Sequence, residues 1–224
     1  MSFSRNLKYN CEKIWEDGYN HPFVQELGEG ILNTERFKFY LLQDYIYLFE
    51  YAKIFALATV KSKNKKLITN FSKTQYEIIN IELNIHKKYM QKFGISEKEI
   101  NCAKPSLFNK AYTSSMISYG LTGNLAEILA AVFPCAWTYY DYATRLRKKY
   151  NNLLEKNFYK SWILNYSSEQ FLDSFEWFYD TLDELVYNMT ELQRKNIQEI
   201  FFSSIEFEYL FWDMSYKQQM GYKI

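Results

Sequence analysis

The chain has 224 residues, a net charge of +1 and an aromatic content of 20%, with only seven Gly and three Pro. This near-neutral charge, spread along the chain, excludes the basic surface of a typical nucleic-acid-binding protein. The longest apolar run, from Leu125 to Phe133, is too short to cross a membrane. Because few turns can form, we expect a few long elements, with enough aromatic side chains for a large core and a ligand pocket.

Apolar residues recur at helical spacing along the chain, and no alternating strand pattern, internal repeat or linker is present. Thr34 and Asn124 are good N-caps, Gly94 is a typical C-cap, and Ser96 with Glu99 has the spacing of a capping box. The predicted helices cover about residues 4–17, 22–27, 34–62, 67–93, a short helix from 96, 105–119, 124–150, 156–166, 168–189 and 190 to beyond 214. The sequence therefore predicts an all-α fold, one multi-helix bundle domain spanning residues 1–224 with eight to ten helices.

The cysteines give an indication of the compartment. Cys11, Cys102 and Cys135 are odd in number and lack the spacing of a disulfide framework. Residues 1–6 are polar and lack the apolar segment of a secretory signal. We therefore expect reduced thiols and a cytoplasmic location.

The stretch from Glu127 to Tyr142 is the most informative part of the chain. It is apolar or aromatic nearly all round, which predicts a buried helix. Pro134 lacks an amide hydrogen and is expected to kink this helix just before Cys135. At about 100° per residue, Cys135, Tyr139 and Tyr142 share one face. A thiol among phenols is a candidate nucleophile for a flat substrate, and the alternative is an inert buried cysteine.

Two carboxylates fall within apolar stripes, where a charge is costly unless it is paired or used. Asp44 shares a helix face with Tyr40, Tyr47 and Tyr51. Each carboxylate could instead make only a structural hydrogen bond.

The second carboxylate, Glu208, belongs to the inward face of the last helix, whereas Glu206 is predicted to face solvent. The other residues of that inward face are Ile197, Phe201, Ser204 and Phe211. Together with Cys135, the two buried carboxylates make a more specific set than any one of them alone.

The two histidines are weaker candidates. Glu82 and His86 share a helix face and could form half of a metal site, but no second such element completes it. An interhelical or surface hydrogen-bonded pair is the favoured interpretation. His21, before Pro22, is expected in a turn or cap. We therefore predict no metal site, and the chain also shows no glycine-rich phosphate loop.

Several motifs, in this order, resemble those of the TenA/thiaminase II family of aminopyrimidine aminohydrolases. The matching stretches are Trp15, 21–23, 39–45, 82–86, 111–114, 133–137, 162–166 and 208–214. The resemblance implies a haem-oxygenase-like fold, a homotetramer, and hydrolysis of 4-amino-5-aminomethyl-2-methylpyrimidine, or of thiamin, to 4-amino-5-hydroxymethyl-2-methylpyrimidine. No metal or organic cofactor is expected, and the partner would be a small molecule.

The resemblance also implies a role for each site residue. Cys135 would be the nucleophile, Glu208 the acid/base and Asp44 the ligand of the pyrimidine's polar edge. The pocket would be lined by Tyr47, Tyr112, Tyr139, Tyr166 and Phe211. The alternative from another class is a non-catalytic pyrimidine-binding protein of thiamin regulation or delivery. A haem or quinone-precursor enzyme would need a histidine in the first long helix, where only His21, expected in a cap, is near.

Overall fold

The computed structural model describes residues 2–221, in which helices are connected by short turns and no strand occurs. The α-helices are α1 (Phe3–Asn10), α2 (Glu12–Tyr19), α3 (Pro22–Glu29), α4 (Thr34–Lys61), α5 (Lys65–Glu77), α6 (Leu83–Lys92), α7 (Glu97–Cys102), α8 (Leu107–Thr122), α9 (Leu125–Lys149), α10 (Lys160–Tyr166), α11 (Glu169–Phe175), α12 (Trp177–Val186) and α13 (Glu191–Lys217). A π-helical turn, η1 (Ile78–Glu82), joins α5 to α6, and a 3₁₀ turn, η2 (Leu154–Lys156), precedes α10. The all-α class is confirmed.

The capping predictions succeed with two corrections. The Ser96–Glu99 capping box, the Asn124 cap and the left-handed Gly94 at φ 73° are all present. The N-cap of α4 is Asn33 rather than Thr34, because the Asn33 side chain accepts from the Glu35 amide at 2.9 Å. Helix α8 continues to Thr122 and does not end at Tyr119, the predicted end.

The helix count was underestimated because three predicted helices are divided. The predicted helix 4–17 breaks at Cys11 into α1 and α2, and the predicted helix 168–189 breaks at Glu176 into α11 and α12. Neither break contains Gly or Pro, the residues on which the predicted boundaries depended. The predicted helix 67–93 is the path α5–η1–α6, whose π-helical turn has no local sequence signal.

The chain forms two compact units, and their boundaries fall between α3 and α4, within α9 and within α13. The first unit comprises residues 2–32 and 129–213, and the second comprises residues 33–128 and 214–221. The single domain predicted for residues 1–224 stays a prediction.

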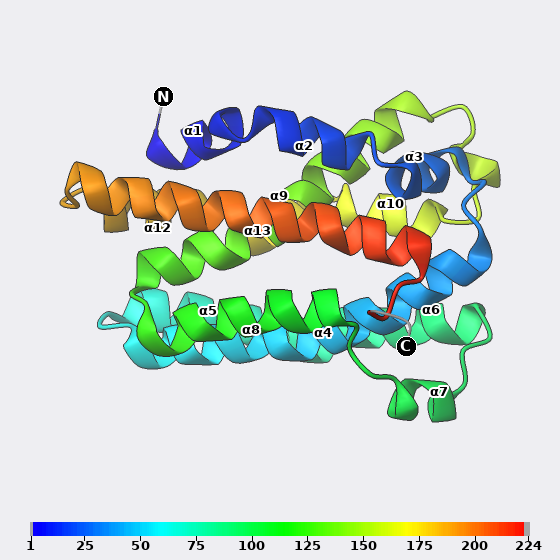
Figure 1. The fold of residues 1–224 in the computed structure, drawn as a ribbon, viewed down its shortest axis with the longest axis horizontal. Helices are drawn as coiled ribbons and strands as arrows, with labels where there is room; N and C mark the ends of the chain where they lie inside the picture. Colours follow the sequence, from blue (N-terminus) through cyan, green and yellow to red (C-terminus); the bar gives the residue numbers. More distant parts are fainter. Residues whose placement is uncertain (1, 222–224) are drawn as a thin grey trace. The chain divides into compact units, whose positions relative to one another are not determined.

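In the first unit, α1 packs against α12, while α2 lies between α1 and α3 along the chain (Figure 1). Its core is aromatic and centred on Phe133 of α9, which is fully buried. The Phe133 ring lies 5.0 Å from that of Trp137 and 4.7 Å from that of Tyr179, measured between centroids. Burial of such large rings provides much of the apolar contact that holds this unit together.

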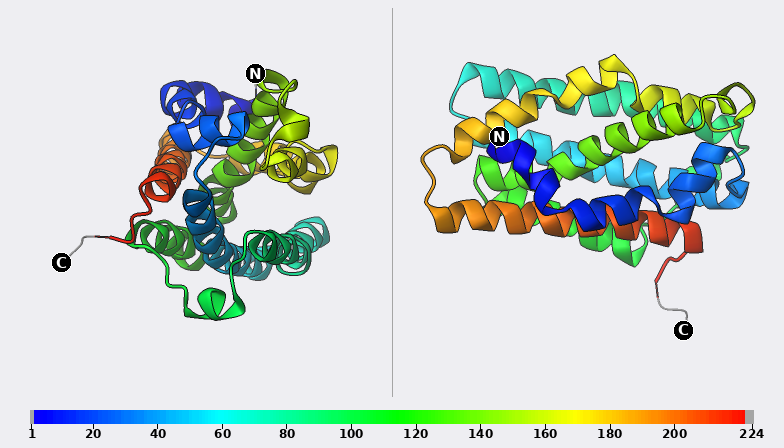
Figure 2. Two further views of the ribbon diagram at one scale, coloured as in Figure 1. Left: turned by 90° about the vertical axis from the view of Figure 1, so that its right-hand side faces the viewer. Right: turned by 90° about the horizontal axis from the view of Figure 1, so that it is seen from above.

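In the second unit, α4 packs against α5, η1, α6 and α8. Both views in Figure 2 place α5 and α8 on opposite sides of α4. The absence of a side chain at Gly120 permits the close approach of α8 to α4, because a Cβ there would lie 2.7 Å from Cδ1 of Leu57. The long α4 therefore forms the centre of this unit, and it carries Asp44.

A methyl group at Gly18 is expected to destabilise the protein by about 1–3 kcal/mol. The added Cβ would overlap the hydroxyl of Tyr142, which is buried and donates to the Trp15 carbonyl at 2.8 Å. Chemical denaturation of Gly18→Ala measures the loss. Combined with Tyr142→Phe, the same change should cost less than it does alone, because the overlapping oxygen is gone. Additive losses would contradict the overlap.

Candidate active site

Asp44 is buried in α4, with 3% of its surface exposed. Its Oδ2 accepts a hydrogen bond from the hydroxyl of Tyr40 at 3.1 Å, one turn earlier on α4. The same oxygen lies 2.6 Å from Nε2 of His86 on α6. The predicted burial of Asp44 beside a phenol is therefore confirmed, and the histidine is an additional partner.

The importance of His86 was underestimated from the sequence. It was interpreted as part of a hydrogen-bonded pair with Glu82, and its imidazole does contact Glu82, but through the backbone carbonyl at 3.0 Å. The buried residues of α6 are Leu83, His86 and Met90, which share one face. A histidine inside an apolar stripe was the available signal that it has a buried partner.

Phenols adjoin Asp44 in the second unit. Tyr47, one turn along α4, is buried, and its ring lies 5.3 Å from that of Tyr112 on α8 and 5.4 Å from that of Tyr51. The Tyr47 hydroxyl contacts the Met116 sulfur at 3.7 Å. The structure thus brings together three predicted site residues, Asp44, Tyr47 and Tyr112, which we call the Asp44 group. Flat phenol faces beside a carboxylate suit an aromatic ligand that carries a hydrogen-bond donor.

The first unit contains the other predicted site residues. Cys135 on α9 is partly exposed, and Tyr139, one turn later, is buried. The Tyr139 ring lies 4.9 Å from that of Tyr166 on α10 and 5.1 Å from that of Trp212 on α13. We call the predicted residues of this unit the Cys135 group: Cys135, Tyr139, Tyr166, Glu208 and Phe211.

Glu208 and Phe211 are both buried on α13, with 3% and 4% of their surfaces exposed, whereas Glu206 is exposed as predicted. The pKa of Tyr142 on α9 shows that Glu208 lies near this helix. Burial raises the pKa of Tyr142 well above 10, and the Glu208 charge raises it further. The part of α13 that carries Glu208 and Trp212 therefore adjoins the part of α9 that carries Tyr139 and Tyr142.

Helix α9 runs unbroken through Pro134, although a proline removes one backbone donor. The hydroxyl of Thr138, four residues after Pro134, donates to the Pro134 carbonyl at 2.9 Å. Such a bond back to the preceding turn is typical of threonine within helices. Cys135 therefore lies within a helix that continues to Lys149, and the kink expected at Pro134 stays a prediction.

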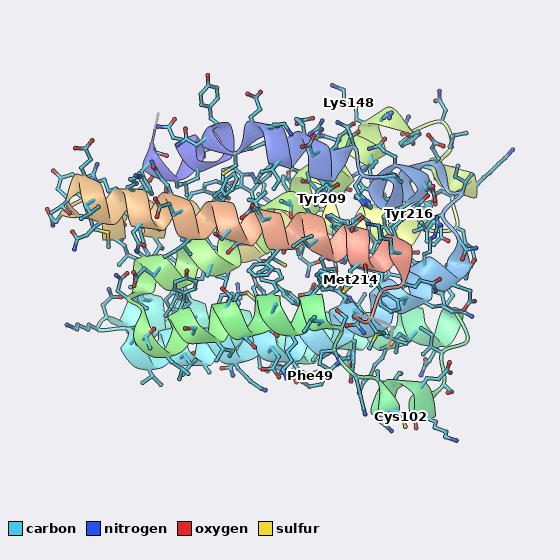
Figure 3. The ribbon with its side chains drawn as sticks, viewed as in Figure 1. Phe49, Cys102, Lys148, Tyr209, Met214 and Tyr216 are labelled. Atoms are coloured by element: carbon cyan, nitrogen blue, oxygen red, sulfur yellow. The ribbon has the colours of Figure 1, made fainter. Side chains whose placement is uncertain are left out.

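The three thiols are reduced but differ in environment. Burial raises the pKa of the Cys11 thiol to about 11, so that Cys11 is a neutral thiol at physiological pH. Cys102 is exposed at the end of α7, at the edge of its unit (Figure 3). Cys135 alone of the three adjoins buried phenols of the predicted site, while its role as the nucleophile stays a prediction.

His21 caps a helix, as predicted. Its Nδ1 accepts from the Phe23 amide at 3.1 Å at the start of α3, and its Nε2 lies 3.7 Å from Asp213. Within residues 2–221, no three His, Cys, Asp or Glu side chains gather in a way that could bind a metal ion. In the same part of the chain, no helix combines the length and apolar character needed to cross a bilayer.

Comparison with solved structures defines the class of fold. A domain of unknown function with a haem-oxygenase-like fold from Shewanella denitrificans superposes with a TM-score of 0.76 at 16% identity, covering 96% of this chain and 92% of that one. A TenA homologue from P. horikoshii superposes with a TM-score of 0.86 at 25% identity, covering 97% and 99% of the two chains. The predicted haem-oxygenase-like all-α fold is confirmed.

Sequence comparison gives the family. Residues 9–218 match the TENA/THI-4/PQQC family. A Helicobacter pylori protein named aminopyrimidine aminohydrolase is 41% identical over 217 residues, covering 97% of this chain and all of the relative. The chain belongs to the TENA/THI-4/PQQC family.

Proposed function

We propose that this protein is an aminopyrimidine aminohydrolase of thiamin salvage. It hydrolyses 4-amino-5-aminomethyl-2-methylpyrimidine to 4-amino-5-hydroxymethyl-2-methylpyrimidine and ammonia, and it acts on thiamin at the same methylene with release of the thiazole. The observation that carries this proposal is the 41% identity, over 97% of this chain and all of the relative, to a protein with that name. A buried carboxylate with phenol neighbours in each unit supports it.

Cys135 starts the reaction. Its thiolate adds to the unsubstituted ring carbon next to the carbon that carries the methylene, while Glu208 protonates the adjacent ring nitrogen. The electron pair on that nitrogen then expels the amino group, which takes a proton and departs as ammonia. Direct displacement by water would face an electron-rich ring, whereas addition of the thiolate first breaks aromaticity and divides one difficult step into easier ones.

Water completes the reaction. It adds to the exposed methylene carbon and loses a proton, and the Cys135 sulfur leaves the ring with its bonding electrons, which restores aromaticity. Glu208 recovers the proton from the ring nitrogen, so that one carboxyl group serves as acid and then as base. The net change is the exchange of ammonia for water, with no electron donor or acceptor required.

The Asp44 group holds the ring. Both Asp44 contacts within its unit use Oδ2, so Oδ1 is assigned to the substrate, where it accepts from the exocyclic amino group. Tyr47, Tyr112, Tyr139, Tyr166 and Phe211 offer aromatic faces to the ring. By the same family resemblance the protein is a cytoplasmic homotetramer, which light scattering of the purified protein tests.

Wild-type protein is expected to release ammonia and the hydroxymethylpyrimidine in equal amounts, over many turnovers, from 4-amino-5-aminomethyl-2-methylpyrimidine in a chelator-treated buffer. Chromatography of the pyrimidines with an enzymatic ammonia assay measures both products. A parallel reaction with thiamin establishes whether the thiazole is also accepted as the leaving group. Stoichiometric binding of the pyrimidines without ammonia release would favour the alternative, a non-catalytic pyrimidine-binding protein.

A further inference from the structure

His86 lies between two oxygen atoms in the second unit. It is buried, with 2% of its surface exposed, and its Nδ1 is 3.0 Å from the Glu82 carbonyl oxygen. Its Nε2 is 2.6 Å from Oδ2 of Asp44. Both ring nitrogens are therefore engaged, one by the backbone of its own helical segment and one by a residue assigned to substrate binding.

The two contacts determine how many protons the pair carries. A backbone carbonyl only accepts, so Nδ1 must carry the hydrogen of the contact with Glu82. The short contact between Nε2 and Asp44 needs a second hydrogen. The pair then holds two protons, as an imidazolium beside a carboxylate or as a neutral imidazole beside a carboxylic acid. A histidine with a hydrogen on Nε2 alone would direct the Nδ1 lone pair at the Glu82 carbonyl oxygen, and two acceptors would then face each other without a hydrogen between them.

The backbone before His86 contains a π-helical turn, and it places the His86 side chain on the face of α6 that contacts α4. The π-helical turn Ile78–Glu82 lies immediately before α6 and supplies the carbonyl that receives Nδ1–H. A π-turn adds a residue to the helical path, which rotates the residues after it by about 100° relative to a continuous α-helix. Such turns are frequent at functional sites.

We propose that His86 is a positioning residue for the pyrimidine, a doubly protonated imidazole that fixes the rotamer and the negative charge of Asp44 so that Oδ1 can accept from the substrate's amino group. This inference rests on the proposed function for the identity of the ligand. Tyr40 supplies the second donor to Oδ2. With that oxygen held by two donors, the carboxylate is fixed in place before the substrate arrives, which lowers the cost of ordering it on binding.

The electrostatic surroundings favour the imidazolium. Among the described residues of the second unit, Asp44 from α4 and Glu82 from η1 interact with His86, and Tyr40 from α4 donates to the same Asp44 oxygen. Burial lowers the pKa of His86, but the hydrogen bond to Asp44 and the charges of Asp44 and Glu82 outweigh it, and the net pKa is raised above its ordinary value of 6.5. The resulting stabilisation is complete below the pKa of the unfolded chain and is lost as the pH rises through the folded pKa.

Nitrogen NMR of the imidazole rings tests the protonation state without any assay of activity. The chain has only two histidines, so the signals that remain in His21→Asn belong to His86 and those that disappear belong to His21. Asparagine retains a side-chain cap for α3. His86 is expected to carry hydrogen on both nitrogens at pH 7, and Asp44→Asn should lower the pH at which it loses one. A neutral His86, with hydrogen on only one ring nitrogen at pH 7, would overturn the proposal, whatever the protein's activity.

Binding of 4-amino-5-hydroxymethyl-2-methylpyrimidine, measured by calorimetry, tests the positioning role. His86→Gln can still donate to Asp44 but carries no charge, and it should weaken binding about 10- to 100-fold, with a smaller effect on kcat than on KM. His21→Asn, a matched loss of a buried histidine, should bind as wild type does. Unchanged affinity in folded His86→Gln would overturn the proposal. Failure of wild type to bind or turn over pyrimidines would refute the proposed function and leave the NMR result standing.

Discussion

Cys135→Ser is expected to lower kcat for 4-amino-5-aminomethyl-2-methylpyrimidine by on the order of 10³-fold or more, with the affinity for the product nearly unchanged. A serine hydroxyl occupies similar space but ionises far less readily than a thiol, so addition to the ring carbon becomes the slow step. Because Cys135 is partly exposed, the exchange should also have little effect on folding.

Steady-state release of ammonia by the two purified proteins measures this effect, and the chain provides matched controls. Cys102 is exposed at the end of α7, and Cys11 is buried in the same unit as Cys135, with a raised pKa. Serine at position 102 should leave the rate unchanged. Cys11→Ser tests whether a buried thiol matters only for stability, through a lower melting temperature at a normal rate. Equal rates for wild type and Cys135→Ser would remove the nucleophile from the mechanism.

Glu208→Gln is the second large effect, an expected loss in kcat of about 10²- to 10⁴-fold. The amide has the shape of the carboxyl group and can donate a hydrogen bond, but it cannot transfer a proton to the ring nitrogen and take it back. Because Glu208 is buried, the neutral amide should fold well.

The control for Glu208 lies two residues away. Glu206 is on the same helix but exposed, so Glu206→Gln removes the same charge from α13 without touching the interior. Turnover by this variant should match wild type within a factor of two or so, as surface changes usually do. If the two variants lost activity equally, the effect would come from the charge of α13 and not from proton transfer by Glu208.

The local chemistry of the sequence predicted much of the fold. Apolar spacing located the long helices α4, α9 and α13, and the capping box at Ser96 and the C-cap at Gly94 were correct, because these signals act within one turn. The break at Glu176 and the π-helical turn at Ile78–Glu82 were missed, since neither has a local signature. Packing between segments can override local propensity, and η1 packs against α4.

In the candidate site, too, the features with a local sequence signal were predicted and those without one were missed. Helical periodicity correctly predicted that Asp44 and Glu208 are buried and that Glu206 is exposed. The pairing of Asp44 with His86 was not predicted, because the two residues are 42 positions apart and meet only when α6 packs on α4. Because Glu82 shares a helix face with His86, the sequence favoured a Glu82–His86 pair over a pair of His86 with a residue distant in the sequence. The roles of Cys135 and Glu208 came from family resemblance and stay predictions.

The central claim is that Cys135 is the nucleophile that adds to the pyrimidine ring. A crystal structure of Cys135→Ser with 4-amino-5-hydroxymethyl-2-methylpyrimidine tests this claim most directly. The account predicts a bound molecule whose unsubstituted ring carbon contacts the serine side chain. A pyrimidine that binds without contacting the serine side chain would contradict it.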